Sequence, residues 1–196
     1  MTVPQQIDFS PSAYIIWAAM ILLLPAGFLV SAFAAAALHE CCHLIALCLF
    51  RVQVYRIEVS ALGARILTAP LTCSQELICA LAGPVGSLLC LSLLRFFPVF
   101  AFCGFVQGLY NLLPLYPMDG GRILNCILQL LAPKCADELC SMLRLCAVLF
   151  VTVAAILLFF RSDDPMFLLF TLYFLFRTCL PRKTPCKDGS DWVQYS

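Results

Sequence analysis

Two histidines and a glutamate stand inside an apolar run of this chain, the stretch AAAALHECCHLIALCLF at residues 34–50. His39, Glu40 and His43 form the pattern H-E-x-x-H, and their neighbours are Ala, Leu, Cys, Ile and Phe. Ionisable side chains are costly to place at membrane depth, and they mark functional sites by default. This cluster is therefore the first candidate site.

The spacing of these residues suits a zinc ion. On a helix, residues four apart lie on one face with Cβ atoms about 5–6 Å apart, so both imidazoles can bind one ion. Glu40, one position on, reaches a water on the metal and serves as general base. A chance match is disfavoured, because His39 and His43 are the only histidines of the chain and lie in an apolar span. Cys42, near the face of His39, is a rival soft ligand that would close the site to water.

A third ligand is required, because a catalytic zinc ion usually has three protein ligands and a water. The stretch YNLLPLYPMDGGRI at residues 110–123 contains one acid, Asp119, which follows Pro114 and Pro117. Broken helices at membrane depth are tolerated only where protein or a water-filled cavity satisfies the freed backbone groups. Asp119 can complete a site of two histidines and a carboxylate, and the alternative is that it caps a helix.

HECCH together with NLLPLYPMDGG resembles the site-2 protease family of intramembrane zinc metallopeptidases. That family combines H-E-x-x-H in one span with N-x-x-P…D-G in a later one, and the resemblance covers about residues 38–123. It implies the following roles: one zinc ion on His39, His43 and Asp119, the general base Glu40, and a contact from Asn111 to the oxyanion or the substrate.

A third motif, LAGPVGS at residues 81–87, is similar to the Ala-Gly-Pro core motif of the same family. Its glycines allow close contact between helices. Ser87 stands where many relatives carry Asn, which is a departure from the family pattern. With no PDZ-like domain expected, the chain most resembles the six-span branch that includes the sporulation sigma-factor-processing peptidase.

Composition defines the setting in which this chemistry must occur. The chain is 63% hydrophobic and 12% charged with a mean hydropathy of +0.97, whereas soluble domains have about 25% charged residues. Segments that approach the roughly 20 residues of a membrane-spanning helix lie at about Ala13–Leu29, Val30–Phe50, Glu76–Leu94, Phe97–Leu115, Leu139–Phe160 and Pro165–Leu180. Pro25 and Gly27 are the expected turn between the first two, and five spans are the alternative. The expected fold is an all-α polytopic membrane protein.

The distribution of basic residues predicts the orientation of these spans. With six spans and a cytoplasmic N-terminus, the inner side holds Arg51, Arg56, Arg65, Arg122, Lys134, Arg177, Arg182, Lys183 and Lys187. The outer side holds only Arg95 and Arg161. Both termini are therefore expected in the cytoplasm. The histidine motif and Asp119 then lie at similar depth on the cytoplasmic side, where they can meet.

The loop between the second and third spans predicts a feature outside the helices. Residues 51–70 alternate in polarity around a turn at Ala61-Leu62-Gly63, which indicates a short β-hairpin at the inner membrane surface. An irregular basic loop is the alternative. A strand edge there would hold an unwound substrate by β-augmentation.

We therefore expect a single integral membrane peptidase domain over residues 1–196, with a catalytic core at about 30–125 and a cytoplasmic tail at about 181–196. Its predicted activity is that of a zinc metalloendopeptidase in the cell membrane. Its partners are a membrane or membrane-associated protein substrate, the lipid bilayer and a regulatory membrane partner, with no nucleic acid. A metal transporter or sensor and an inactive scaffold are the rival functions. Intact Glu40 argues against both, because it stands where a base belongs.

Overall fold

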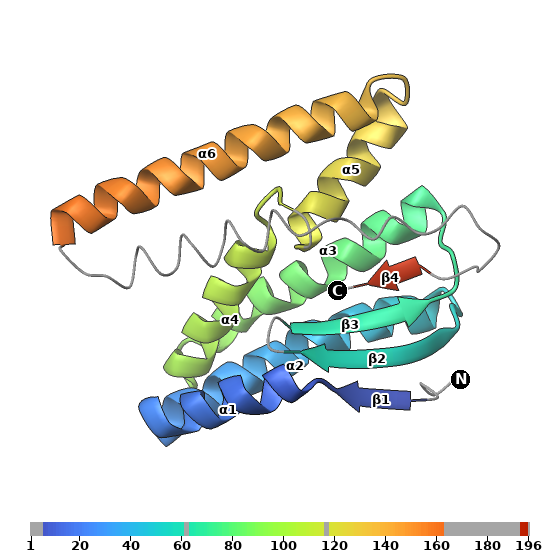
Figure 1. Ribbon diagram of the computed structural model, residues 1–196. Coiled ribbons are helices and arrows are strands. Elements are labelled where there is room, and N and C mark those ends of the chain that lie inside the picture. Colours follow the sequence, from blue (N-terminus) through green and yellow to red (C-terminus); the bar gives the residue numbers. More distant parts are fainter. Residues whose placement is uncertain (1–5, 61–62, 116–117, 163–192, 196) are drawn as a thin grey trace.

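The computed structural model describes residues 6–60, 63–115, 118–162 and 193–195, which are mostly helical with one small sheet (Figure 1). In chain order the elements are β1 (Gln6–Phe9), α1 (Pro11–Leu23), α2 (Ala26–Leu49), β2 (Val54–Ser60), β3 (Gly63–Thr68), α3 (Cys73–Leu89), the 3-10 helix η1 (Cys90–Leu93), α4 (Pro98–Asn111), α5 (Asp119–Leu131), α6 (Ala136–Ser162) and β4 (Val193–Tyr195). The helical class expected from composition is confirmed. The sixth apolar segment, Pro165–Leu180, lies outside the described residues.

The first two helices are separated by a proline. Leu24 is extended, with φ −108° and ψ 146°, and Pro25 precedes α2. A residue before proline is driven out of the helical region by contact with the proline ring. The boundary thus lies at the turn expected from Pro25, a few residues before the end of the first predicted span at Leu29.

A left-handed residue ends α2 and turns the chain into the sheet. Arg51 has φ 55°, and the N–H of Val52 donates to the carbonyl of Leu47 at 3.0 Å. This is the Schellman arrangement, which satisfies a helix-end carbonyl. The next helix, α3, begins with a capping box in which Thr72 and Gln75 exchange hydrogen bonds.

Four helices form the centre of the molecule. α3 contacts α2, α4 and α5, and α2 also contacts α4. Figure 1 shows α6 as a long outer helix beyond α5. It packs against α5 and against the buried pair Leu115 and Met118. The site therefore has to be sought where α2, α3, α4 and α5 converge.

The sheet has the order β1-β2-β3-β4. β2 and β3 are antiparallel, from Val54 opposite Thr68 to Ser60 opposite Gly63. β1 lies parallel on the free edge of β2, and β4 lies antiparallel on the free edge of β3. β1 and β4 were not expected from the sequence. The position of this sheet at the inner membrane surface stays a prediction.

A buried cluster joins the sheet to the helices. Val54 and Ile66 from the strands pack with Ala46 and Leu47 from α2 and with Cys79 from α3. Cys79 is fully buried. The face of the sheet is thereby fixed against the two helices that carry the candidate site.

The outside of the helices is apolar. Leu22, Leu49, Phe96 and Phe150 are each more than 70% exposed, which is unfavourable in water and favourable in lipid. Two helical stretches, Ala26–Leu49 and Cys73–Leu93, are long and apolar enough to cross a membrane. The number of six spans and their orientation stay predictions.

α5 is a helix that the sequence interpretation did not anticipate. It begins at Asp119, directly after the extended Met118. The residues DGG at its start read as a turn in sequence, although Gly and Asp are both compatible with a first helical turn. Asp119 therefore starts a helix, but its side chain is not assigned to capping.

Candidate metal centre

The two histidines of H-E-x-x-H lie one turn apart on the inward face of α2. Both are buried, with 3% exposure for His39 and 4% for His43. Their ring centroids are 4.8 Å apart and the ring planes meet at 84°. This places both Nε2 atoms in one small volume, 3.2 Å from each other.

The carboxylate comes from a helix start that is pressed against the end of α4. A Cβ on Gly120 would lie 2.2 Å from the carbonyl oxygen of Leu112 and 2.3 Å from that of Leu113. Only glycine permits this approach, since both contacted atoms belong to the main chain. The close contact brings Asp119, which is 2% exposed, to the histidines of α2.

The ligand atoms of the three residues converge. Asp119 Oδ2 lies 3.1 Å from His39 Nε2 and 3.2 Å from His43 Nε2. His39, His43 and Asp119 form a buried group that can hold a metal ion, with ligand atoms all within 4.8 Å of one another.

Helix α3 holds the far side of each imidazole. The Nδ1–H of His43 donates to the carbonyl of Cys79 at 2.7 Å, and Nδ1 of His39 lies 2.9 Å from the hydroxyl of Ser87. A carbonyl only accepts, so His43 carries its proton on Nδ1 and leaves a lone pair on Nε2. This is the usual arrangement of histidines that bind metals.

Glycines of α3 make room for the α2 side chains. A Cβ on Gly83 would lie 2.2 Å from His43 Nε2 and 2.8 Å from His39 Cε1. A Cβ on Gly86 would lie 2.2 Å from Cys42 Sγ. The Ala-Gly-Pro motif therefore provides close contact, as predicted. Cys42 packs against Gly86 and is not in the group of ligand atoms, so the structure does not support it as a rival ligand.

These residues fit a zinc ion by three independent features. Two nitrogens at 2.0–2.1 Å from a tetrahedral zinc lie about 3.3 Å apart, close to the 3.1–3.2 Å separations found here. The donor set of two imidazoles and one carboxylate is a known catalytic set. Asp119 Oδ1 is buried and has no hydrogen-bond partner among the described residues, so it is available to an ion or a water.

The two remaining predicted site residues stand beside this group. Asn111, the last residue of α4, has its Nδ2 atom 3.3 Å from His39 Nε2. Glu40 is half-buried next to His39, and its carboxyl group interacts electrostatically with both histidines and with Asp119. The structure thus brings together all five residues predicted from the two motifs.

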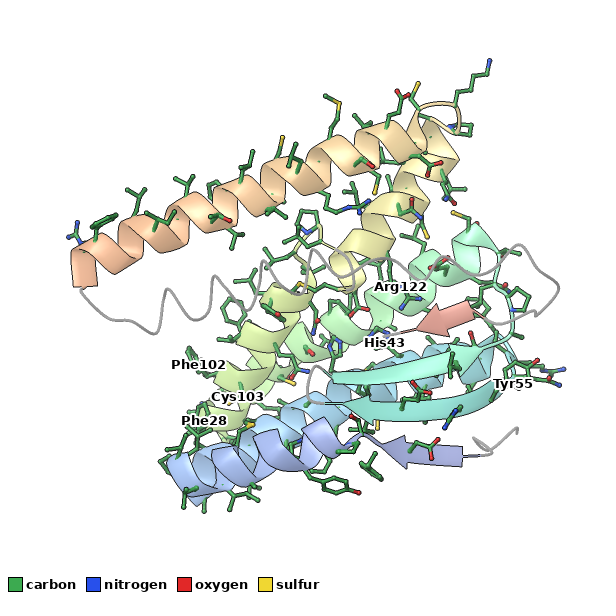
Figure 2. The ribbon with its side chains drawn as sticks, in the orientation of Figure 1. Phe28, His43, Tyr55, Phe102, Cys103 and Arg122 are labelled. Atoms are coloured by element: carbon green, nitrogen blue, oxygen red, sulfur yellow. The ribbon has the colours of Figure 1, made fainter. Side chains whose placement is uncertain are left out.

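A buried arginine that was predicted only as a cytoplasmic charge supports the carboxylate. Arg122 is 4% exposed, and its Nε lies 3.5 Å from Glu76 Oε1 on α3. Its Nη1 atom lies 4.0 Å from Asp119 Oδ1. Arg122 thereby connects the Asp119 end of α5 to α3. The sequence interpretation placed Arg122 between the fourth and fifth predicted spans, so it gave no signal for this pairing. Figure 2 shows Arg122 and His43 in the central part of the molecule.

Fold and site together define a helical protein with an apolar exterior and a buried site suited to a metal ion. A family model, Peptidase family M50, matches residues 66–155. That range includes Asn111 and Asp119, whereas H-E-x-x-H precedes it. A search of solved structures finds "Site-2 Protease from Methanocaldococcus jannaschii", with a TM-score of 0.61 and 20% identity over 95% of this chain and 98% of that chain. The comparison with curated proteins finds no match.

The resemblance to the site-2 protease family that the motifs indicated is confirmed by these findings. The structural match shows a shared fold over nearly the whole of both chains. The family match is to a peptidase family and covers somewhat less than half of the chain.

Proposed function

We propose that this chain is a zinc metalloendopeptidase that cleaves membrane or membrane-associated proteins in or near their membrane-spanning segments. The observation that carries the proposal is the convergence of His39 Nε2, His43 Nε2 and Asp119 Oδ2 at 3.1–3.2 Å, with Glu40 beside them. A site made only to transport or sense a metal needs no general base at this position.

His39, His43 and Asp119 would hold the zinc ion. When bound, zinc supplies Lewis acidity, which polarises the scissile carbonyl and makes a water molecule more acidic. Glu40 takes the proton from the attacking water and delivers it to the leaving amine. The amide of Asn111 donates to the oxygen on which negative charge develops.

The substrate must present an unwound segment, because the carbonyls of a helix are bonded internally. β3 is suited to hold such a segment by β-augmentation. Its residue Ile66 packs in the same buried cluster as Cys79, whose carbonyl holds His43. The edge of β3 is occupied by β4, with Ile66 opposite Tyr195. A substrate strand at this edge would have to replace β4.

The membrane orientation that we propose is inferred from the distribution of the basic residues. Both termini and the metal centre lie on the cytoplasmic side of a six-span protein. Regulation by a membrane partner is part of this proposal. The finer substrate assignment, a precursor of a sporulation sigma factor, rests on the resemblance of the short six-span form to that branch of the family.

The test compares the wild-type chain with Glu40→Gln, each co-expressed with single-span and sigma-factor-like candidate substrates. Cleavage is measured by immunoblot, and zinc by metal analysis of the purified protein. We expect wild type to cleave and Glu40→Gln to keep its zinc without cleaving. Equal cleavage by both would exclude Glu40 as the base. Zinc binding without cleavage, accompanied by metal flux in vesicles, would instead identify a transporter.

A further inference from the structure

The hydroxyl of Ser87 has a single hydrogen-bond partner among the described residues, and that partner is a candidate metal ligand. Ser87 is fully buried on α3, and its Oγ lies 2.9 Å from Nδ1 of His39. Water cannot replace this contact without repacking, because the residue has no exposed surface. The hydroxyl is therefore committed to the histidine.

The direction of this hydrogen bond follows from the role of the other ring nitrogen, Nε2. His39 Nε2 points to Asp119 Oδ2 and to His43 Nε2, where a metal ion would sit. A nitrogen that binds a metal uses its lone pair, so the ring proton must be on Nδ1. Ser87 Oγ then accepts from Nδ1–H, which a hydroxyl oxygen can do with either of its lone pairs.

The two histidines are held in different ways by the same helix. His43 donates to the backbone carbonyl of Cys79, whereas His39 donates to the side chain of Ser87. The rings are nearly perpendicular, and their partners Cys79 and Ser87 lie about two turns apart on α3. Of these two contacts, only the one between His39 and Ser87 is made by a side chain. A single substitution at Ser87 can therefore remove it.

Helix α4 restricts the space around Ser87. A Cβ on Gly108 would lie 3.0 Å from Ser87 Cβ, and a Cβ on Gly104 would lie 3.1 Å from the Ser87 carbonyl oxygen. A small side chain that can still accept a hydrogen bond is what this space admits.

We propose that Ser87 is a positioning residue of the metal centre, which fixes the ring orientation and the tautomer with which His39 presents Nε2 to zinc. The proposal rests on the proposed function, because it requires a zinc ion at His39. It goes beyond that function by assigning to α3 a side chain that controls metal affinity without touching the metal.

The test measures zinc affinity in the full-length chain, in detergent micelles, by competition with a chromophoric chelator. We expect Ser87→Ala to bind zinc about 10–100-fold more weakly than wild type, the usual cost of removing the hydrogen-bond partner of a ligating histidine. The matched control is Ser92→Ala, because the exposed Ser92 on η1 donates its hydroxyl only to the carbonyl of Leu89, the last residue of α3. Its zinc affinity should equal that of wild type.

A second measurement reports on the tautomer directly. His39 and His43 are the only histidines, so ¹⁵N-histidine labelling gives two imidazole spin systems. In the zinc-loaded wild type both should carry the proton on Nδ1. Ser87→Ala should shift the Nδ1 resonance of one ring and leave the other, held by Cys79, unchanged. A merely structural change would not select one ring.

Each result decides the proposal. Unchanged zinc affinity and unchanged ¹⁵N shifts in Ser87→Ala would overturn it while the metal centre stands. If wild type itself binds no zinc, the proposed function fails and this inference fails with it. Should Ser87→Ala lose its helical circular dichroism, Ser87→Cys replaces it, because a thiol fills the space but accepts hydrogen bonds weakly. Weaker zinc binding by Ser87→Cys supports the proposal, and wild-type affinity overturns it.

Discussion

Gly83 lies so close to His43 that a Cβ on residue 83 would stand 2.2 Å from the Nε2 atom of the imidazole. The side chain missing at Gly83 is therefore part of the geometry of the metal centre. A helix interior normally disfavours glycine by about 1 kcal/mol relative to alanine. At this position glycine is needed despite that cost, because the imidazole of His43 fills the space that a Cβ would occupy.

Replacing Gly83 by alanine should separate stability from metal binding. The helix gains propensity, but the new methyl group displaces His43 from the convergent ligand set. We expect a loss of zinc affinity above the roughly 10–100-fold that removal of a ligand's hydrogen-bond partner causes, with unchanged helical circular dichroism. The control is Gly27→Ala, since a Cβ on Gly27 would meet nothing within 4 Å. Wild-type zinc binding by Gly83→Ala would contradict the assignment of His43 as a ligand.

Asn111 allows a test of rate without loss of metal. Its Nδ2 atom is 3.3 Å from His39 Nε2, beside the ligand atoms, but its amide is not one of them. Asn111→Ala should retain zinc and lower kcat by about 10²–10³, the usual effect of losing one oxyanion donor. Single-turnover cleavage together with metal analysis measures both quantities. A loss of zinc that parallels the loss of rate would assign Asn111 a role in holding the site instead.

Zinc removal should abolish cleavage and leave the fold intact. The zinc site joins α2 to α5, but α2 is also held by packing against α3 and α4, and α5 by packing against α3 and α6. Dialysis against a strong chelator should stop cleavage with little change in far-ultraviolet circular dichroism. Stoichiometric zinc should restore it, whereas magnesium should not, because two imidazoles are poor ligands for that ion. Full activity in zinc-free protein would exclude the metal mechanism.

Arg122 and Glu76 should be energetically coupled. Arg122 is buried, the side chain of Glu76 is 28% exposed, and Arg122 Nε lies 3.5 Å from Glu76 Oε1. Leaving one partner of a buried ion pair alone is destabilising by about 3–5 kcal/mol, and the partial exposure of Glu76 lowers this expectation to about 1–2 kcal/mol. A double-mutant cycle with Glu76→Gln and Arg122→Gln, followed by denaturant titration, measures the coupling. Additive effects would show that the pair does not stabilise the α3–α5 contact.

The candidate ligands were predictable because their chemistry conflicts with their surroundings. Two histidines and an acid in an apolar span need a reason to be there, and H-E-x-x-H gives one. Asp119 was harder to assign, since an acid before two glycines also reads as a turn. The structure shows that this stretch starts helix α5 and that the Asp119 carboxylate lies with the two histidines, whereas no side-chain capping bond is present at this helix start.

The groups that support these ligands could not be predicted from sequence spacing. Cys79 and Ser87 are 36 and 48 residues from the histidines that they hold. Which side chain or carbonyl of α3 meets which ring depends on how two helices pack, and that is a property of the whole fold. The strands β1 and β4 were not predicted for the same reason, because a short strand is stable only when it pairs with a partner that the fold provides.

The last prediction concerns the edge of β3, where a substitution should change the activity without changing the metal centre. β4 pairs with β3 through Ile66, Leu67 and Thr68, opposite Tyr195, Gln194 and Val193. If an unwound substrate binds at this edge, β4 competes with it. Gln194→Pro removes a backbone donor and disfavours β4 as a strand. It should therefore raise the cleavage rate at low substrate concentration by lowering KM, with kcat and zinc content unchanged.

The matched control for this prediction is Gln194→Ala, which changes the same side chain and keeps the backbone N–H. Its KM should stay close to that of wild type. A rise in KM for Gln194→Pro would mean that β4 helps to bind the substrate, as one strand of a wider sheet. An unchanged KM would place the substrate elsewhere. In either case the metal chemistry at His39, His43 and Asp119 would stand, because neither substitution touches those residues.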